Sequence, residues 1–388
     1  MKGKIYQIIN GKVLTPSGWL KKGCVVLKDG KIAEVSTTTP PIEGAIVIDA
    51  AGLFVTPGCI DMHVHGGGGH DFLEATPEAF NAVTKAHALH GTTALYATLA
   101  VFSPDALQQA IQTCEYVQAH PIDGASVLGL HLEGNYLNEK MKGGQPPEYI
   151  SLPCPEEYKA ILDSTSYIKR WSAAPELPGA LDFAGYASQR GVVVSLAHTT
   201  AGYKEVKAGY ETGFTHVTHF YNAMTGLHKD REYKHEGTIE SIYLMDGMTV
   251  EVIADGIHVP PALLKLVHKF KGVERTALVT DSMAAGACRE TAHIFDPRVI
   301  IEDGVCKLAD HSALAGSIAT ADRLIRTMVE QAEIPLEDAV RMASETPARI
   351  MGILDRKGTI EPGKDADIII FDEDINIKNT FVEGKLVL

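Results

Sequence analysis

The sequence has no long uninterrupted apolar run, although apolar residues make up 45% of its 388 residues. A membrane-spanning helix needs roughly 18 or more consecutive apolar residues, so we expect no membrane span. The first residues pass straight into a strand-like pattern without the apolar core of a signal peptide. The apolar content is instead sufficient for a large buried core, and the length suits one elaborated domain with an appendage.

Paired cysteines and an excess of positive charge are also missing. No C-x-x-C pair occurs, and the six cysteines lie far apart, at Cys24, Cys59, Cys114, Cys154, Cys288 and Cys306. Scattered cysteines are usually reduced and packed as small apolar residues, which favours a cytoplasmic protein. The net charge of −14 argues against a nucleic-acid binder, which needs a basic patch. An anionic small molecule stays possible, because backbone N–H groups and one or two cations can hold a phosphate.

Both ends of the chain show short strand patterns separated by turn dipeptides. In residues 1–57, turns such as Asn10-Gly11 and Asp29-Gly30 separate strands expected at 5–9, 24–27, 32–35 and 45–48. In residues 357–388, strands are expected at 357–360, 366–371 and 380–388. Two β-rich ends around a different middle predict one small β-sandwich domain assembled from residues 1–57 and 357–388.

The middle, residues 58–356, alternates strands with helices. Two helix starts, at Thr76-Pro77-Glu78 and Ser103-Pro104-Asp105, combine a capping hydroxyl, a proline and an acid. Eight strands are expected, at 58–65, 93–97, 127–133, 167–173, 192–198, 214–219, 249–255 and 275–281. This count indicates an α/β fold of the (β/α)8 TIM-barrel type, whose strand ends converge on one mouth. A doubly wound open sheet is the alternative, but it does not need metal ligands from so many successive strands.

Residue types that bind metals stand where these strands end. His63 and His65 project to the same face of a strand and offer two imidazoles to a transition metal, although a loop after a strand could also hold them. Glu133 closes an apolar strand, and a buried carboxylate there needs a partner or a metal. Four further candidates close other strands: His198, His219, Asp255 and Asp281. Asp281 is placed to hold an activated water and shuttle its proton, with a helix N-cap as the alternative.

Two other histidines are expected to stay outside the metal site. His131 shares a strand face with Glu133 but lies one layer deeper, which is typical of a hydrogen-bonded core histidine. His216 and His219 lie three residues apart, so strand parity puts them on opposite faces. Since His219 is nearer the C-terminal end, we expect His216 to face the surrounding helices.

Together these residues resemble the amidohydrolase superfamily: His-x-His after strand one, Glu after strand three, His after strands five and six, and Asp after strand eight. Within the superfamily, the chain is more similar to the N-acetylglucosamine-6-phosphate deacetylases. The resemblance is carried by segments 57–66 (PGCIDMHVHG), 129–134 (GLHLEG), 197–199 (AHT), 218–224 (THFYNAM), 254–258 (ADGIH), 280–283 (TDSM) and 314–317 (LAGS). Dihydroorotase- and hydantoinase-like relatives carry a lysine at the end of strand four, where this chain has none. Glu133 would take the bridging role instead.

The resemblance implies a metal-dependent hydrolase that converts N-acetylglucosamine-6-phosphate to glucosamine-6-phosphate and acetate, as a homodimer. One or two divalent ions, zinc or iron first and manganese or cobalt next, would be held by His63, His65, Glu133, His198, His219 and Asp281. Asp281 would also be the catalytic group. Substrate contacts would come from Gly144, Gln145, Asn222, Ala223, Arg231, Asp255, Gly256, Ile257, His258, Leu314, Ala315 and Gly316. The galacto epimer, another amide and an inactive barrel used for assembly stay open as alternatives.

Two positions behind strand three depart from the family pattern. Asn135 stands where a proline is usual, and we expect it to loosen that turn. Gln145 stands where many relatives have a histidine that contacts the N-acyl carbonyl. Its amide can donate a hydrogen bond to that oxygen but cannot become a cation.

The phosphate is expected to meet an arginine that follows the HFYNAM motif. Arg231 is the candidate because Arg231-Glu232 matches the family's Arg-Glu pair, and it is expected to serve either its own subunit or the neighbouring one. His228, Lys229 and Lys234 are reserve phosphate cations, with a solvated loop as the alternative.

Overall fold

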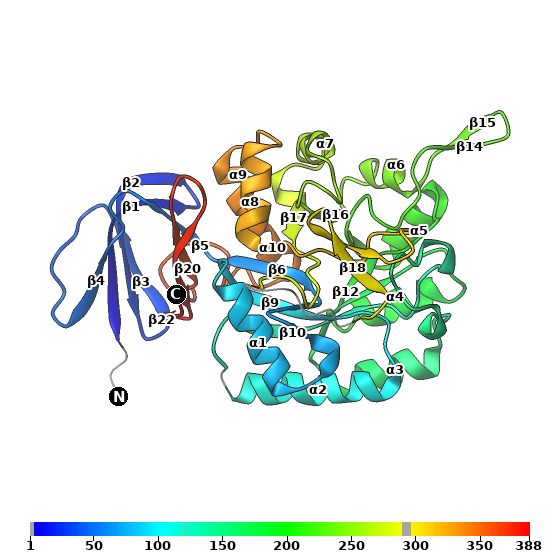
Figure 1. The fold of residues 1–388 in the computed structure, drawn as a ribbon, viewed down its shortest axis with the longest axis horizontal. Coiled ribbons are helices and arrows are strands. Elements are labelled where there is room, and N and C mark those ends of the chain that lie inside the picture. Colours follow the sequence, from blue (N-terminus) through cyan, green and yellow to red (C-terminus); the bar gives the residue numbers. More distant parts are fainter. Residues whose placement is uncertain (1–3, 121, 289–295) are drawn as a thin grey trace.

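The computed structural model describes residues 4–120, 122–288 and 296–388, and it contains a barrel with a smaller sheet beside it (Figure 1). Eight parallel strands form the barrel, in the order β17-β16-β13-β12-β11-β10-β9-β6. They are β6 (Cys59–Val64), β9 (Thr92–Leu99), β10 (Ser126–Glu133), β11 (Ile168–Ala173), β12 (Val193–Leu196), β13 (Phe214–Val217), β16 (Thr249–Ile253) and β17 (Thr276–Val279). Just beyond β17, the Asp281 N–H donates to the His63 carbonyl at 2.8 Å and links the last strand to the first. The expected (β/α)8 barrel is confirmed.

Helices surround this barrel. They are α1 (Pro77–Ala88), α2 (Pro104–Ala119), α3 (Pro155–Ser164), α4 (Ala180–Ser188), α5 (Tyr203–Thr212), α6 (Thr238–Tyr243), α7 (Pro261–Lys271), α8 (Ala321–Glu330), α9 (Leu336–Ala343) and α10 (Glu345–Ile350). Both expected helix starts are confirmed, since Thr76 Oγ1 and Ser103 Oγ each accept a backbone N–H three residues on. Short one-turn segments and hairpins occupy the loops.

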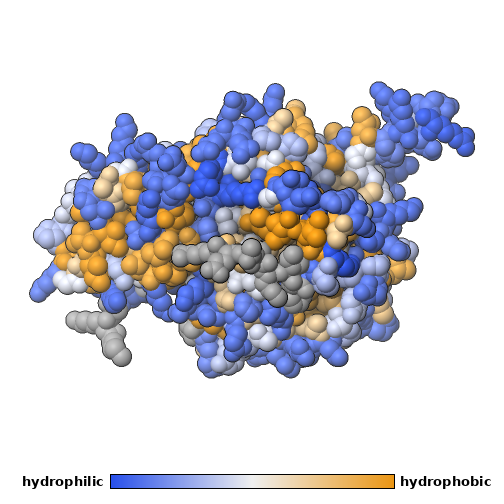
Figure 2. Space-filling view, viewed as in Figure 1, coloured by the Kyte–Doolittle hydropathy of each residue, from blue (hydrophilic) through white to orange (hydrophobic). Residues whose placement is uncertain are grey.

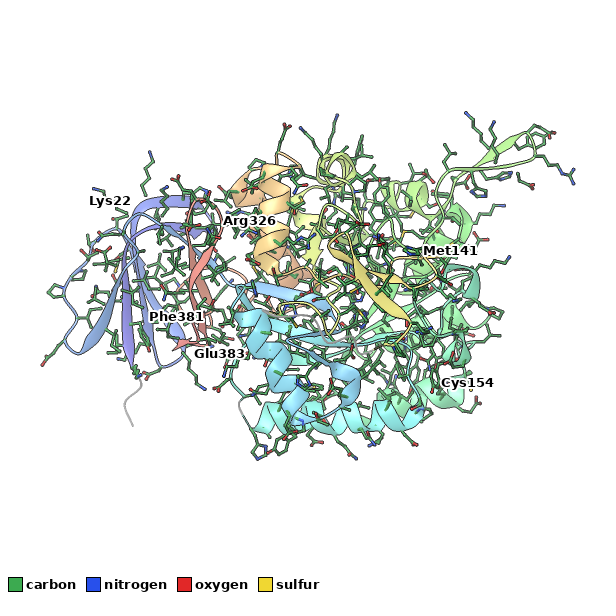
Figure 3. All side chains as sticks on the ribbon, viewed as in Figure 1. Lys22, Met141, Cys154, Arg326, Phe381 and Glu383 are labelled. Atoms are coloured by element: carbon green, nitrogen blue, oxygen red, sulfur yellow. The ribbon has the colours of Figure 1, made fainter. Side chains whose placement is uncertain are left out.

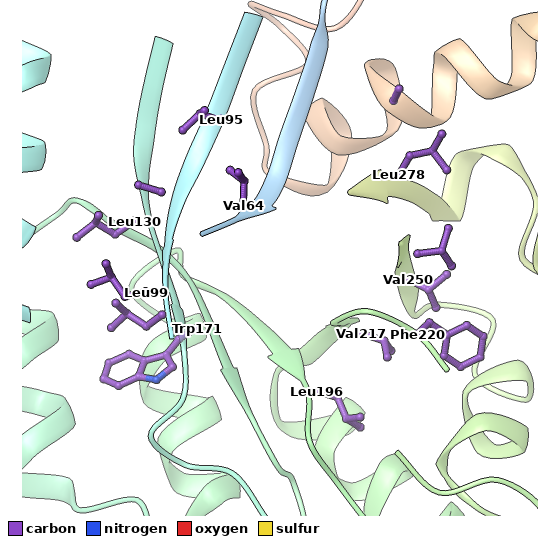
Figure 4. Close-up of a cluster of buried hydrophobic side chains, with 14 of the residues drawn as sticks. Val64, Leu95, Leu99, Leu130, Trp171, Leu196, Val217, Phe220, Val250 and Leu278 are labelled. Atoms are coloured by element: carbon purple, nitrogen blue, oxygen red, sulfur yellow. The ribbon is translucent and has the colours of Figure 1, made fainter. Parts of the chain in front are cut away.

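Residues alternate between the two faces of the barrel strands. Outward side chains such as Leu95, Leu130 and Trp171 pack against the helices in the largest apolar core (Figure 4). The intervening positions point into the barrel, and several of them are polar and buried: His131, Glu133, Arg170, Ser172, Ser195, His216 and Glu251. The barrel therefore holds a polar interior, with apolar side chains such as Tyr96 and Ile253 in a separate cluster.

Strands from both chain ends form the smaller sheet. Its order is β22-β21-β20-β5-β1-β2-β3, with β4 also paired to β1. The strands are β1 (Ile5–Thr15), β2 (Gly18–Lys28), β3 (Lys31–Ser36), β4 (Ala45–Asp49), β5 (Phe54–Pro57), β20 (Ile368–Phe371), β21 (Ile377–Val382) and β22 (Lys385–Leu386). A small β-domain from both termini is thus confirmed, while its exact boundaries at 57/58 and 356/357 stay a prediction.

Two details of this sheet differ from the sequence expectation. Residues 357–360 form no strand; Ile360 instead packs into the core of the sheet. β5 was not expected because it is short and ends in a proline, but it pairs with both β1 and β20 and so joins the two chain ends. On the barrel side, Arg326 (labelled in Figure 3) donates to the Asp374 and Ile375 carbonyls at 3.0 Å each, which ties α8 to this part of the chain.

A two-stranded hairpin, β14 (His228–Asp230) and β15 (Tyr233–His235), projects away from the barrel (Figure 1). Its residues are exposed, and it is strongly hydrophilic in Figure 2. None of the helices among the described residues has the length and apolar character needed to cross a bilayer.

Candidate metal centre and active site

Six buried side chains from five barrel strands converge at the C-terminal mouth of the barrel. They are His63, His65, Glu133, His198, His219 and Asp281. Glu133 lies at the centre: its Oε1 is 2.9 Å from His219 Nε2 and 3.2 Å from His198 Nε2. Its Oε2 is 3.2 Å from His65 Nε2. Asp281 Oδ1 lies 3.1 Å from the same His65 nitrogen. The structure therefore brings together all six residues that the sequence singled out, and their role as ligands stays a prediction.

Three of the four histidines are oriented by a hydrogen bond from Nδ1. His63 Nδ1 donates to Glu251 Oε1 at 2.7 Å, His198 Nδ1 to the Met141 carbonyl at 2.7 Å, and His219 Nδ1 to the Asn222 carbonyl at 3.1 Å. With Nδ1 occupied in this way, Nε2 is the nitrogen that a metal would bind, in exchange for any proton held there. His65 Nδ1 is buried without a hydrogen-bond partner among the described residues.

The backbone turns sharply where these side chains leave their strands. His198, His219 and Asp281 have positive φ values of 46°, 29° and 48°. Residues other than glycine rarely adopt this left-handed backbone conformation, and backbone strain of this kind is concentrated at functional sites. The turn redirects each side chain toward the mouth of the barrel.

The same turn makes one sequence expectation wrong. His216 does not face the helices: its Nε2 lies 3.3 Å from Glu251 Oε2, and its ring is fully buried inside the barrel. β13 ends at Val217, before His219. Because the regular strand alternation stops there, His216 and His219 both point inward. His131 is the expected core histidine, bonded to Thr98 Oγ1 at 3.2 Å and Ser172 Oγ at 2.7 Å.

The charged groups of the cluster lie so close together that each shifts the pKa of its neighbours. Burial disfavours a charged His63, but Asp281, Glu133 and Glu251 outweigh it and raise the His63 pKa to about 9. Burial would raise the pKa of Glu133, yet the imidazoles around it, His63 first, hold that pKa well below its usual range. The Asp281 pKa is also lowered, because His63 and His65 outweigh its burial. Both carboxylates are therefore ionised and available to a cation.

The donor atoms fall into two overlapping sets that share Glu133. One set is His63, His65 and Glu133, and the other is Glu133, His198 and His219. In each set the donor atoms lie within 4.8 Å of one another. Imidazole nitrogens and carboxylate oxygens of this kind suit zinc and other first-row transition metals. The residues present therefore fit one or two divalent ions.

Gln145 and Asn135 are both tied to their surroundings. Gln145 Nε2 donates to Glu133 Oε2 at 2.8 Å, and Gln145 Oε1 accepts the Val101 N–H at 3.1 Å. Asn135 was expected to loosen its turn, which stays a prediction; its side-chain amide accepts from the Phe102 N–H and donates to the Phe102 carbonyl. Two hydrogen bonds thus join the Asn135 side chain to one backbone residue.

Most of the expected substrate contacts lie on neighbouring loops at the same mouth. After β16, Asp255 Oδ2 accepts from His258 Nδ1 at 2.8 Å, and Gly256 and Ile257 lie between these two. After β13, the Asn222 side-chain nitrogen is buried without a partner among the described residues, and Ala223 follows it. Residues 314–316 lie beside Asp281, because the Ser317 N–H donates to the Asp281 carbonyl. A Cβ at Gly144 would lie 3.0 Å from Ala315 Cβ, which places these two loops together.

Arg231 is not brought to this site within its own chain. It lies in the turn of the β14–β15 hairpin with a φ of 54°, between strands that project from the barrel (Figure 1). His228, Lys229 and Lys234 are on the same exposed hairpin.

Two charged residues next to the site were missed by the sequence argument. Arg170 on β11 and Glu251 on β16 are fully buried inside the barrel, and Glu251 bonds directly to His63. Each is a charged residue inside a strand that is otherwise mostly buried: Glu251 is the single charge of β16, and Arg170 follows the partly exposed Lys169 in β11. That pattern is the signal that could have identified them, since a charge there needs a buried partner.

Comparison with known proteins places this chain in a family. The profile of the amidohydrolase family matches residues 54–387. N-acetylglucosamine-6-phosphate deacetylase of Bacillus subtilis is 32% identical over 96% of this chain and 95% of its own. N-acetylgalactosamine-6-phosphate deacetylase of Escherichia coli O157:H7 is 32% identical over 97% of each chain.

The fold comparison extends over the whole molecule. The crystal structure of N-acetylglucosamine-6-phosphate deacetylase from Pasteurella multocida superimposes with a TM-score of 0.92 at 28% identity, covering 98% of this chain and 99% of that one. The family profile thus covers most of the chain, and a solved relative matches its fold from end to end. This chain belongs to the amidohydrolase family.

Proposed function

We propose that this protein removes the acetyl group of N-acetylglucosamine-6-phosphate by hydrolysis, giving glucosamine-6-phosphate and acetate. The observation that carries the proposal is the buried group of four imidazoles and two carboxylates at the barrel mouth. It is supported by relatives named for this activity that align over nearly the whole chain. The galacto epimer is the second candidate, because a relative named for it is equally similar.

Two divalent ions are proposed, one at each donor set, with Glu133 shared between them. The intact His63 and His65 pair supports the second ion, since without it only the Glu133, His198 and His219 set would remain. When bound, such ions act as Lewis acids that activate water and polarise a carbonyl. Zinc or iron is proposed first, with manganese or cobalt as alternatives, because this donor set accepts all four and availability selects among them.

Asp281 is proposed as the acid–base group. Its carboxylate is ionised and lies at the edge of the ligand cluster, 3.1 Å from His65 Nε2. It accepts the proton of the attacking water and then delivers that proton to the departing amine nitrogen. Gln145 has a second amide hydrogen beyond its bond to Glu133, and this hydrogen is proposed to bind the acetamide oxygen.

The phosphate is proposed to lie over the loops that follow β13 and β16. The buried Asn222 side-chain nitrogen has no protein acceptor among the described residues, and Asp255 holds His258 through its Nδ1. The remaining cation is proposed to be Arg231 of a partner subunit in a homodimer, since the hairpin carries it away from its own barrel. A cytoplasmic location is proposed because all six cysteines are unpaired.

The direct test is to assay metal-loaded protein against four substrates: the gluco and galacto N-acetyl sugars, each with and without a 6-phosphate. We expect release of acetate from N-acetylglucosamine-6-phosphate, with kcat/KM several orders of magnitude above that for N-acetylglucosamine. Faster turnover of the galacto 6-phosphate would show that this epimer is the substrate. Equal rates on phosphorylated and unphosphorylated sugars would show that the protein does not recognise the 6-phosphate.

A further inference from the structure

A buried ion pair lies in the barrel directly beneath the proposed metal ligands. Arg170 Nη1 and Glu251 Oε2 are 2.5 Å apart, and both side chains are completely buried. Burying two charges is costly even when they pair, and apolar side chains of similar size often replace such pairs without loss of stability. The position and contacts of this pair therefore call for a reason other than stability alone.

Glu251 contacts two of the proposed ligands. Its Oε1 accepts the His63 Nδ1–H at 2.7 Å and the backbone N–H of His219 at 3.1 Å. The first contact keeps the proton on His63 Nδ1, so that Nε2 faces Glu133 and Asp281. A carboxylate that receives the second N–H of a ligating histidine fixes its ring and increases its basicity.

Arg170 in turn holds the Glu251 carboxylate in place. Its Nε donates to Ser195 Oγ at 2.9 Å, and its Nη2 donates to Thr218 Oγ1 at 2.8 Å. Nη1 also donates to the carbonyl of Met62, which directly precedes His63, at 3.1 Å. A planar guanidinium anchored at these three places presents its remaining N–H to the carboxylate in a fixed direction.

The two halves of the proposed metal site differ in how they are supported. His198 and His219 are oriented by main-chain carbonyls, those of Met141 and Asn222. His63 is oriented by the side chain of Glu251. Loss of Glu251 should therefore disturb the His63 and His65 half more than the other half.

We propose that Arg170 and Glu251 are positioning residues that orient His63 and so set the metal affinity of the His63, His65 and Glu133 set. This inference rests on the proposed function only in that both use the same metal centre. Neither residue is proposed to touch substrate. The role is to hold one ligand in the geometry and the protonation state that a divalent ion requires.

The test is zinc titration of the metal-free protein in competition with a chromophoric chelator, without substrate. Glu251→Gln preserves size but removes the charge and turns an amide N–H₂ toward Arg170. We expect one zinc equivalent to bind as in wild type and the other to weaken by about 10–100-fold, the range seen when such supporting partners are changed. Ser195→Ala removes one anchor of Arg170 and should weaken the same equivalent by a few-fold, which provides a milder variant if Glu251→Gln folds poorly.

Asp367→Asn is the matched control. Asp367 pairs with the buried Lys357 at 2.6 Å in the part of the chain next to the small sheet, and it contacts none of the proposed ligands. This variant neutralises one carboxylate of a buried ion pair and should leave both zinc equivalents unchanged. The double variant Arg170→Met with Glu251→Gln removes both charges, so its Tm should recover relative to Glu251→Gln while the weakened zinc equivalent does not.

Three outcomes would overturn the proposal. The first is zinc binding by Glu251→Gln within threefold of wild type at both equivalents. The second is an equal loss at both equivalents, and the third is recovery of tight zinc binding together with Tm in the double variant. All three are read without substrate, from zinc binding and, for the third, Tm, whereas failure of the proposed function would appear as missing deacetylation by the metal-loaded wild-type protein.

Discussion

At the scale of single residues, the site depends on a few side chains whose surroundings set their charge and direction. Three of the proposed ligands have left-handed backbone conformations, and Asp281 is one of them. Its carboxylate stays ionised although it is buried, because two imidazoles lie within hydrogen-bond distance. A group that is ionised at rest can accept a proton from water and return it later.

Asp281→Asn should therefore abolish most turnover while metal content stays near normal. The amide has nearly the same shape but cannot accept the proton, and groups of this kind typically contribute about 10²–10⁴-fold. Steady-state kinetics with metal analysis of the same sample would check this. A variant that retains more than about a tenth of wild-type kcat would show that Asp281 is not the proton acceptor.

His87 on α1 should make the fold sensitive to mild acid. Its Nε2 donates to the Gly66 carbonyl at 2.9 Å, and burial, the largest influence, lowers its pKa to about 4. An unfolded histidine titrates near pH 6.5. Between about pH 6.5 and pH 4 the unfolded chain holds a proton that the folded chain does not, so stability is full above this range and falls as the pH falls through it.

The corresponding variant is His87→Gln, which retains a hydrogen-bond donor but does not titrate. At about pH 5 the wild type should have lost about 2 kcal/mol through this residue relative to about pH 7.5. Thermal unfolding of both proteins in metal-free form would measure it, and the variant should lose less Tm between these two pH values. An identical loss in both proteins would mean that His87 is not a source of acid sensitivity.

At the scale of elements, the loops after the strands carry the proposed chemistry, and the β14–β15 hairpin stands apart from them. Among the polar residues of the hairpin, Tyr233 is 65% exposed, and Leu227, which directly precedes the hairpin, is 62% exposed. Exposed apolar residues on a projecting element are typical of a surface that packs against another molecule. In a homodimer, a second copy of this chain would cover these side chains, and Arg231 would reach the substrate phosphate in that second copy.

Arg231→Ala should reduce kcat/KM for the phosphorylated substrate and leave the unphosphorylated sugar unaffected. A charge-assisted hydrogen bond is worth about 1.5–3 kcal/mol, which corresponds to a loss of roughly 10- to 150-fold. If the arginine acts across a dimer, mixing Arg231→Ala chains with Asp281→Asn chains should restore part of the activity in hybrid sites. Lys229→Ala is the matched control on the same hairpin, and a greater loss from that variant would move the phosphate contact away from Arg231.

At the scale of the whole molecule, closure of the barrel brings side chains from five strands to one point, and we expect metal binding to depend on all of them. The purified protein should carry about two equivalents of divalent metal per chain, because both donor sets around Glu133 are complete. Elemental analysis after gentle purification, with and without added metal, would measure this. A value that stays at or below one equivalent after supplementation would leave only one of the two sets as a metal site.

The sequence alone determined the fold of this protein and the place of its candidate site. The alternation of strands and helices from residue 58 onward predicted the barrel, because period-two and helical patterns are local properties of the chain. The positions of His63, His65, Glu133, His198, His219 and Asp281 at strand ends predicted their convergence, since parallel strands of a barrel all end at one mouth.

Only the tertiary structure decided which other residues support that site. Glu251 is separated along the chain by 81 residues from Arg170 and by 188 from His63, and no local pattern pairs them. His216 and His219 both point inward because β13 ends before His219, and Asn135 is hydrogen-bonded to the Phe102 backbone, which lies beside it. In each case the deciding contact comes from a segment distant in sequence or from the point where a strand stops, and neither is visible until the chain has folded.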